Sequence, residues 1–248
     1  ISLDNSEWMR NGDYTPSRLE AQSDAVNLLF NVKTQTNPEN TVGLMTMGGA
    51  SPKVDVTLTR DVGKILSALH NIQISGSCTM SNGIQIAQLV LKYRQNKNQR
   101  QRIVVFVGSP VAEDEATLVR LGKKLKKNNV AVDVVNFGEE ADNTAKLEAF
   151  VAAVSSSDNS HLVSVPPGPH LLSDMLLASP IIEGGEGTAA AAAAAGAGFE
   201  FGVDPSLDPE LALALRISME EEKARQEAAA GKVKSAGGEG GAASGSGE

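Results

Sequence analysis

The residues from Asp208 to Glu222 have the clearest capacity in this chain to bind another molecule. Asp208 is a good helix N-cap, and Pro209 suits the first helical position because the N–H group that proline lacks would have no partner there. Side chains spaced i, i+3, i+4 and i+7 then share one helix face as a narrow apolar stripe with a small residue at its centre. These are Leu211, Ala214, Leu215 and Ser218. With acidic residues on both sides of the stripe, the pattern predicts a protein partner that is apolar in the middle and basic around the rim.

This spacing resembles the ubiquitin-interacting motif, a single helix that grips the apolar patch of ubiquitin. The resemblance implies a ubiquitin-binding set made of Glu210, Leu211, Ala214, Leu215, Ser218 and Glu221. The alternative is an amphipathic helix packed on the chain's own core. The flanking sequence favours the first interpretation, because the run Ala189–Ala195 and its neighbouring glycines indicate a flexible linker and the Gly/Ser-rich end of the chain indicates a disordered tail.

The sequence offers few residues for catalysis. The three histidines, His70, His161 and His170, lie far apart in the chain. Ser109 follows a predicted strand in Gly-Ser-Pro, which is not the Gly-x-Ser-x-Gly turn of a serine hydrolase. Cys78 is interpreted as a packed thiol. We therefore predict that the chain is not an enzyme.

The charge composition of the chain indicates which kinds of partner are unsuitable. The 248 residues carry a net charge of −8, and 12 of the 30 acidic residues but only 5 of the 22 basic ones lie in 181–248. This excess of acid gives no reason to expect a nucleic acid or an anionic membrane as partner. No apolar run is long enough for a membrane span, and a single cysteine is typical of a reducing compartment, the cytosol or the nucleus.

The segments that precede this helix alternate between two periodicities. Apolar runs typical of strands occur at residues 1–3, 42–47, 54–58, 103–107, 130–137 and 162–165. Helical periodicity occurs at 15–33, 61–70, 83–93, 114–127 and 143–154. Only the second and third strands are joined without a helix, by a short loop that contains glycine, which predicts a hairpin. The fold class is therefore α/β, a doubly wound and mostly parallel sheet with one antiparallel edge strand.

That architecture resembles the von Willebrand factor A domain. We assign residues 1–182 to this domain, 183–202 to the linker, 203–230 to the motif helix and 231–248 to the tail. Because Ile1–Leu3 looks like the last half of a strand, we expect a few further residues before Ile1 in the native chain.

Many von Willebrand factor A domains bind a divalent metal through Asp-x-Ser-x-Ser and two further loops. Here Trp8 stands where the second serine should be, and the loop at Ser109 has no acid at its turn, although Thr79 is available in a middle loop. We expect no metal and no other cofactor. The remaining polar residues, Asp4 and Ser6, are expected to hydrogen-bond local backbone and to shape an interaction surface.

Over nearly its whole length the chain resembles the ubiquitin-receptor subunits of the 26S proteasome regulatory particle. The segments that carry the resemblance are Asp4-Asn5-Ser6-Glu7, Arg10-Asn11-Gly12-Asp13, Asn136-Phe137-Gly138-Glu139 and Phe201-Gly202-Val203-Asp204-Pro205. The family implies a first domain that docks on the particle and helps to hold lid and base together, and a helix that captures polyubiquitin chains on substrates. We assign docking to the surface near Asp4 and Arg10, and the location to cytoplasm and nucleus. The alternatives are a ubiquitin-binding adaptor outside the proteasome and a metal-dependent adhesion or chelatase-type module.

Overall fold

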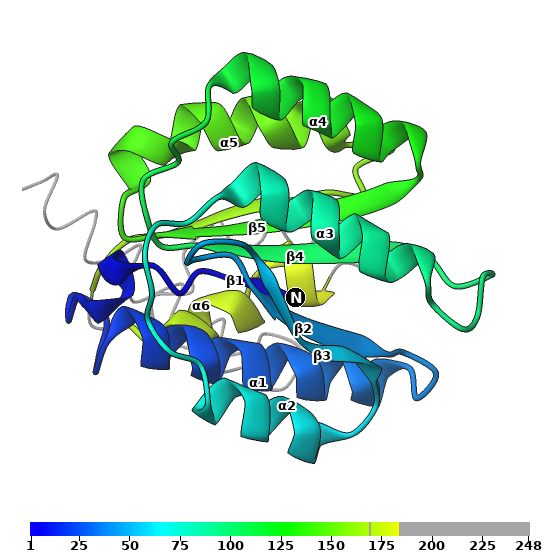
Figure 1. Cartoon of the computed structure of the whole chain (residues 1–248), viewed down its shortest axis with the longest axis horizontal. Coiled ribbons are helices and arrows are strands. Elements are labelled where there is room, and N and C mark those ends of the chain that lie inside the picture. Colours follow the sequence, from blue (N-terminus) through cyan, green and yellow to red (C-terminus); the bar gives the residue numbers. More distant parts are fainter. Residues whose placement is uncertain (169, 184–248) are drawn as a thin grey trace, which may run out of the picture. The chain divides into compact units, whose positions relative to one another are not determined.

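The computed structural model describes residues 1–168 and 170–183. The predicted linker, motif helix and tail lie outside the described residues, apart from the first residue of the linker. The described part is built around one six-stranded sheet with helices on both faces (Figure 1). The predicted α/β fold class is confirmed.

The sheet has the order β3-β2-β1-β4-β5-β6, and every neighbouring pair is parallel except β2 and β3. Its strands are β1 (Ser2–Leu3), β2 (Val42–Thr46), β3 (Lys53–Thr59), β4 (Gln101–Val107), β5 (Val130–Phe137) and β6 (Leu162–Val165). The predicted hairpin is present, and it places β3 antiparallel at the edge of the sheet. Gly49 in its loop has a φ of +89°, a conformation that glycine adopts without the steric penalty of a side chain.

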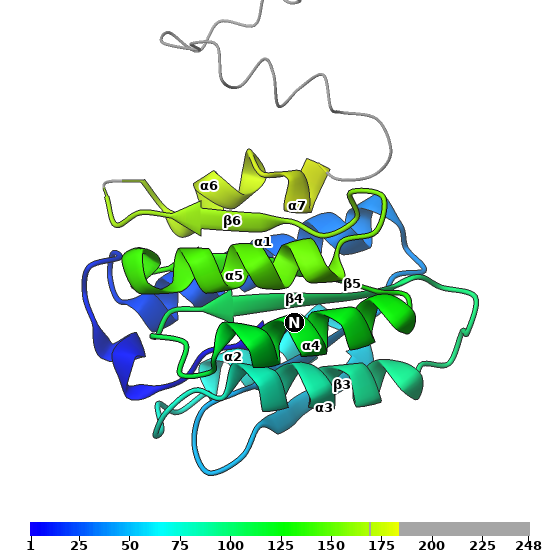
Figure 2. The same cartoon turned by 90° about the horizontal axis from the view of Figure 1, so that it is seen from above.

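The helices form two layers. One face of the sheet is covered by α1 (Arg18–Thr36), α2 (Val62–His70) and α6 (Leu172–Leu177), followed by the short α7 (Pro180–Glu183). The other face is covered by α3 (Met80–Lys92), α4 (Glu115–Lys127) and α5 (Glu140–Val154), which lie side by side across the sheet (Figure 2). Each layer has its own apolar core, because parallel strands covered on both faces bury side chains of both orientations.

The central strands show why the sheet is buried on both faces. In β5 every residue from Val130 to Phe137 is buried, and so are the last five residues of β4. These two strands pair in parallel along their whole length, from Gln101 opposite Val130 to Val107 opposite Asn136. The apolar run at 103–107 therefore occupies the central position that its composition predicts.

Side-chain caps set the beginning of several helices. The carboxylate of Asp61 accepts a hydrogen bond from the Gly63 amide at the start of α2, and that of Asp114 accepts one from the Thr117 amide at the start of α4. The helix predicted from residue 15 begins instead at Arg18, because the hydroxyl of Ser17 accepts a hydrogen bond from the Glu20 amide. None of the helices in the described ranges is both long and apolar enough to cross a membrane.

Three short helices lack a periodic signal in the sequence. They are the 3-10 helix η1 (Glu7–Arg10) after β1, and α6 and α7 after β6. Four to six residues make at most about two turns, too short for an apolar period to stand out. Their apolar side chains Met9, Leu176 and Ile181 are nevertheless fully buried in the core beside α1.

Candidate functional site

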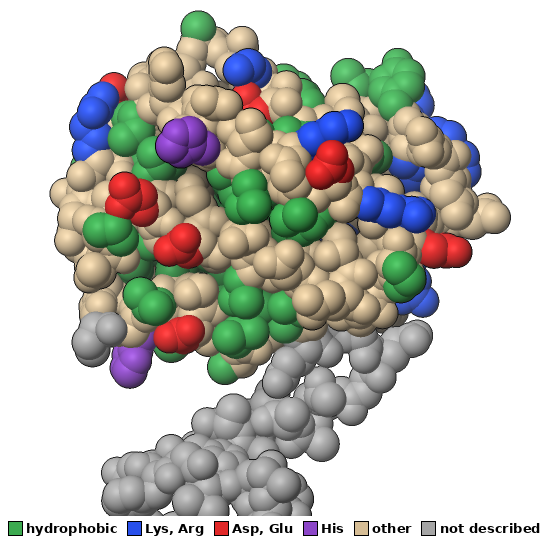
Figure 3. Space-filling view, turned by 90° about the horizontal axis from the view of Figure 1, so that it is seen from below, with side chains coloured by type: hydrophobic (Ala, Val, Ile, Leu, Met, Phe, Trp, Pro, Cys, Tyr) green, Lys and Arg blue, Asp and Glu red, His purple; other side chains and the backbone are tan. Residues whose placement is uncertain are grey.

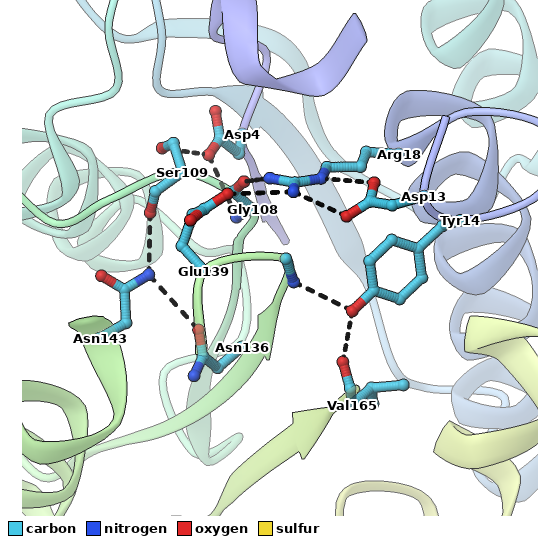
Figure 4. A network of polar contacts seen from close by, with 11 residues as sticks. Asp4, Asp13, Tyr14, Arg18, Gly108, Ser109, Asn136, Glu139, Asn143 and Val165 are labelled. Carbon is cyan, nitrogen blue, oxygen red and sulfur yellow. Dashed lines mark hydrogen bonds and ion pairs between the residues drawn. The ribbon is translucent and has the colours of Figure 1, made fainter. Parts of the chain in front are cut away.

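The candidate site lies at the carboxyl edge of the sheet, where the strand order changes direction. β1 lies between β2 and β4, so the chain leaves the carboxyl ends of β1 and β4 toward opposite helix layers. In doubly wound sheets this switch point is where ligands are usually bound. The loops after β1, β4 and β5 meet here in a network of polar contacts (Figure 4).

Asp4, the first residue after β1, is fully buried and lies at the centre of this network. One carboxylate oxygen accepts a 2.9 Å hydrogen bond from the Ser6 amide. The other accepts bonds from the Gly108 amide at 3.1 Å and from the Ser109 hydroxyl at 2.6 Å. Three donors therefore stabilise a buried carboxylate that would otherwise be costly to remove from water.

These residues do not fit the divalent metal that many domains of this fold hold. A hard cation takes about six oxygen ligands, and Asp4 is the only carboxylate among the three matching loop positions, with both oxygens already accepting hydrogen bonds. Trp8 replaces one hydroxyl ligand, and Ser109 donates its hydroxyl to Asp4. The Ser6 hydroxyl is buried without a partner in the described chain, so one element of the metal motif persists there. Asp4, Ser6, Gly108 and Ser109 instead form a hydrogen-bonded junction between the loops after β1 and β4.

Asn5, in the loop after β1, connects that loop to the segments that follow β2 and α2. Its side-chain oxygen accepts a 2.7 Å bond from the Gly48 amide after β2, and its amide nitrogen donates to the carbonyl of Gln73 at 2.9 Å. Close packing leaves no room for a side chain at Gly48, where a Cβ atom would lie 2.7 Å from Asn5 Oδ1. The loop that ends in η1 is thus held by the segments after β2 and α2.

Arg18 is the second centre of the network and is also buried, with 2% of its side chain exposed. Its guanidinium donates two parallel hydrogen bonds to the Asp13 carboxylate at 2.8 and 2.7 Å, and one to Glu139 at 3.0 Å. A fourth bond reaches the Gly108 carbonyl at 2.6 Å. The bonds from Arg18 lower the pKa of Asp13. This buried charge connects the turn before α1 with the loops after β4 and β5.

Gly138, next to Glu139, makes the approach of this guanidinium possible. Its φ is +91°, and a Cβ atom there would collide with Arg18 Nη1 and Cζ. Its amide donates a 3.0 Å hydrogen bond to the hydroxyl of Tyr14, which itself donates to the carbonyl of Val165 at the end of β6. Burial raises the pKa of Tyr14 to about 12, so the phenol stays protonated as a donor.

Asn143 on α5 closes the network on the other side. It is fully buried, donates to the Ser109 carbonyl at 2.9 Å and accepts a 2.8 Å bond from the Val111 amide. A longer contact of 3.5 Å joins it to Asn136 at the end of β5. An amide fits this position because it can donate and accept at once. Neither Asn143 nor Arg18 was predicted as a site residue, because most of their partners are distant in the chain. Val111 lies 32 positions from Asn143, and Glu139 lies 121 positions from Arg18.

The network supports an exposed surface made by η1. Met9 is buried beneath it, whereas 46% of Trp8 is exposed. Glu7 and Arg10 form a 2.7 Å ion pair on the outside, with 56% and 65% of their side chains exposed. We call Glu7, Trp8 and Arg10 the η1 surface. Trp8 was missed as a surface residue, although an aromatic residue in a polar loop is a signal for an interface.

The structure separates the two residues to which we assigned docking. Arg10 is on the η1 surface, but Asp4 is inside and its carboxylate cannot touch a partner in this conformation. Asp4 therefore shapes the surface from below. Docking itself stays a prediction. The predicted ubiquitin-binding residues Glu210, Leu211, Ala214, Leu215, Ser218 and Glu221 lie outside the described residues.

The geometry gives no support for catalysis by the described residues. Burial, with the charges of Asp4 and Glu113, raises the pKa of the Cys78 thiol, which disfavours the reactive thiolate. His161 lies 3.2 Å from Asp133, a carboxylate of β5 that also pairs with Arg102. In the described ranges no hydrogen bond joins a histidine to Ser109 or Cys78.

A second face of the domain carries several exposed apolar side chains. Figure 3 views the layer formed by α1, α2 and α6, on which hydrophobic side chains are spread between polar ones. Leu66 of α2 and Met175 of α6 are 44% and 38% exposed, and both helices pack against α1. Exposed apolar groups of this kind can form part of a protein interface, so this helix face is the second candidate for docking.

Replacing Arg18 with Met should destabilise the fold strongly. Met keeps much of the apolar volume but leaves the half-buried Asp13 and Glu139 and the Gly108 carbonyl without their donor. Losing one partner of a buried ion pair costs about 3–5 kcal/mol of unfolding free energy. The control is Arg10→Met, which breaks an exposed ion pair and should leave the free energy of unfolding nearly unchanged, because water screens that pair. Equal losses for the two variants in urea unfolding would contradict the central role of Arg18.

Comparison with known proteins extends these observations. The family model "von Willebrand factor type A domain" matches residues 1–110. The crystal structure of the SpRpn10 VWA domain is similar over 76% of this chain and 96% of that chain, with 56% sequence identity and a TM-score of 0.70. A conserved hypothetical protein, BatB from Bacteroides thetaiotaomicron, is 16% identical with a TM-score of 0.60, over 74% of this chain and 96% of that one, and shares the fold alone.

Relatives of known name match nearly the whole chain. The Arabidopsis thaliana "26S proteasome non-ATPase regulatory subunit 4 homolog" is 58% identical over 94% of this chain, which spans 62% of that relative's length. The Schizosaccharomyces pombe "26S proteasome regulatory subunit rpn10" is 57% identical over 94% of this chain and 92% of its own length. With such identity along nearly all of one relative, the chain belongs to the family of 26S proteasome non-ATPase regulatory subunit 4.

Proposed function

We propose that this chain is a non-catalytic polyubiquitin receptor of the 26S proteasome. The helix predicted at 203–230 captures ubiquitin chains on substrates, and the folded domain docks on the regulatory particle and helps to hold lid and base together. The observation that carries the proposal is the ubiquitin-interacting spacing from Glu210 to Glu221 in a chain whose relatives are named as proteasome subunits. The proposal places the chain in cytoplasm and nucleus.

The folded domain has the features of a docking module. Its carboxyl edge holds the η1 surface on a buried network, so Trp8 and Arg10 are presented by a rigid base. An aromatic and an arginine side chain are the types most often central to protein interfaces. The alternative use of this edge, a metal-dependent adhesion or chelatase-type site, is disfavoured by the hydrogen bonds that occupy Asp4.

The predicted helix is suited to weak and reversible capture. One short helix buries less area than a standard protein interface, so its Kd for a single ubiquitin should be on the order of 10⁻⁴ M. A polyubiquitin chain that also engages other receptors is held more tightly, because binding at one site raises the effective concentration at the next. Weak single contacts then allow the substrate to leave for unfolding and degradation.

A ubiquitin-binding adaptor outside the proteasome is the second candidate function. It would use the same helix, with the folded domain docked on a different assembly. The two candidates differ in one observable, since a proteasome receptor co-sediments with 26S particles and the adaptor does not. The names of the relatives favour the first candidate.

Replacing Leu211 and Leu215 together with Asn should abolish ubiquitin binding. Both lie on the predicted apolar stripe, and truncating a central interface residue typically costs at least about 2 kcal/mol, which is roughly a 30-fold loss of affinity. NMR titration of ¹⁵N-ubiquitin with the full chain measures the change. The matched control replaces Leu213 and Ile217 with Asn on the opposite face of the helix and should bind as the parent does. A stripe variant that still saturates ubiquitin would remove the helix from the proposal.

Replacing Trp8 with Ala and Arg10 with Glu should release the chain from the regulatory particle. These changes alter the η1 surface without touching the buried network, so ubiquitin binding in the free chain should be unchanged. Co-sedimentation with 26S particles measures docking.

Two further variants test which surface docks. Tyr93→Ala with Lys92→Glu changes an exposed aromatic and an exposed cation at the end of α3 and should leave docking intact. Leu66→Asp with Met175→Asp changes the apolar helix face. Release by this last variant together with full docking of the η1 variant would assign docking to the helix face instead.

A further inference from the structure

The segment that contains α3 and α4 carries an excess of positive charge. Residues 80–127 include ten basic and three acidic residues, and the three acids are consecutive, at 113–115. Both helices lie in the same layer on the sheet, so their outer sides form part of one face of the domain (Figure 2). That face is positive in a chain whose net charge is −8.

Four of the basic side chains form one row along α4. The row consists of Arg120, Lys123, Lys124 and Lys127. Their spacing of i, i+3, i+4 and i+7 places them on one side of the helix, and all four are exposed. None of the ion pairs in the described ranges includes a member of this basic row. Lys126 has a different role, because its amino group donates a 2.7 Å hydrogen bond to the Ser155 carbonyl.

Stabilisation of the helix end explains only part of the basic row. Cations in the last turn of a helix interact favourably with the helix dipole, which accounts for Lys124 and Lys127. Arg120 and Lys123 lie before that turn, where the dipole has little effect. Like charges spaced i, i+3 or i+4 repel one another, so the row destabilises α4 unless a negatively charged partner lies against it.

The neighbouring side of α3 adds exposed apolar groups. Leu89 on the helix is 52% exposed, and Tyr93 at its C-cap is 78% exposed. The two residues are one turn apart and therefore lie on the same side of the helix. The ring of Tyr93 stacks on no other aromatic ring among the described residues. Large apolar side chains that are left this exposed are typical of a protein interface.

The apolar groups and the basic row lie near each other. α3 packs beside α4, and both helices end at the edge of the sheet where β4 and β5 begin together, with Gln101 opposite Val130 (Figure 2). The axes of packed helices are about 8–10 Å apart, so one ligand can touch both. The η1 surface is at the other edge of the sheet. We call the set formed by Leu89, Lys92, Tyr93 and the basic row the α3–α4 face.

We propose that the α3–α4 face binds an acidic amphipathic helix of a partner protein. Two helices that lie side by side offer a seam on which a third helix packs, ridges into grooves. Leu89 and Tyr93 contact the apolar stripe of that helix, and the basic row pairs with carboxylates spaced one turn apart along it. The row covers about 10 Å, which is two turns of the partner helix.

The chemistry of the face favours a protein over a nucleic acid. Leu89 is an aliphatic group that phosphates do not contact favourably, and Tyr93 is the one aromatic side chain of the α3–α4 face, too few for a stacking platform. The net charge of −8 opposes the approach of a polyanion. Ubiquitin is also unsuited, because the surface expected to bind the motif helix has a basic rim. The partner is therefore additional to those in the proposed function.

The test titrates the full chain into a labelled peptide of about 20 residues, long enough to form a helix, in which Glu flanks a narrow stripe of Leu. Fluorescence anisotropy measures the Kd. Replacing Lys123 and Lys124 with Glu should weaken binding at least about tenfold, and so should Leu89→Ser with Tyr93→Ser. A peptide with Gln in place of Glu should bind the parent chain at least about tenfold more weakly.

The matched control reverses two exposed cations elsewhere in the domain. Lys53→Glu with Lys64→Glu changes β3 and α2 by the same charge and should leave the Kd within about twofold of the parent value. All of these variants change exposed residues, so their thermal unfolding midpoints should stay close to that of the parent. Co-sedimentation with 26S particles should also be unchanged, because the η1 surface is intact.

Several outcomes would overturn the proposal. The α3–α4 face is not the site if the acidic peptide fails to bind at millimolar concentration, or if the face and control variants bind it equally well. Tighter binding of single-stranded DNA than of the peptide would indicate a general polyanion patch. Self-association of the full chain that the face variants abolish would assign the face to contacts between copies. None of these results bears on ubiquitin binding or on docking, so the proposed function is tested separately.

Discussion

The buried guanidinium of Arg18 is the interaction on which the carboxyl edge of this domain depends. It links Asp13 before α1, the Gly108 carbonyl after β4 and Glu139 after β5. A buried charge is tolerated only when nearby groups satisfy it, so these three segments must keep their mutual positions. Asp4 adds a second fixed point through Gly108 and Ser109. The contacts of Arg18 and Asp4 therefore hold in place the loop that carries the η1 surface.

The same edge shows how a metal-binding architecture can serve a different purpose. In Asp4 the carboxylate is kept, but its charge is balanced by two amides and a hydroxyl from its own chain. Hydrogen bonds to Asp4 from the loops after β1 and β4 join these loops, as shared coordination of a cation would. The junction therefore needs no ion to hold the loops together, and Trp8 is free to face outward. Under the proposed function, a partner protein rather than a cation binds this edge.

The chain separates its charges in a way that suits two tasks. The folded domain is nearly neutral, whereas residues 181–248 hold 12 acidic and 5 basic residues and so contribute most of the net charge of −8. Acidic residues around a narrow apolar stripe favour a partner with a basic rim, while a neutral domain can pack closely on a large assembly. Under the proposed function, capture and anchoring are therefore carried out by different segments of the chain.

The sequence by itself determined the order of strands and helices of the main domain, the hairpin at its edge and the ubiquitin-interacting spacing, because these depend on periodicity and on residues close together in the chain. The predicted ends of helices and strands differed from the observed ends by a few residues, as at the start of α1, where Ser17 is the N-cap. The short helices η1, α6 and α7 had no periodic signal in the sequence. Only the tertiary structure decided that Asp4 is buried, that Arg18 and Asn143 organise the edge and that Trp8 faces out. Those roles arise from contacts such as Asp4 with Ser109, 105 positions apart, which no local pattern encodes.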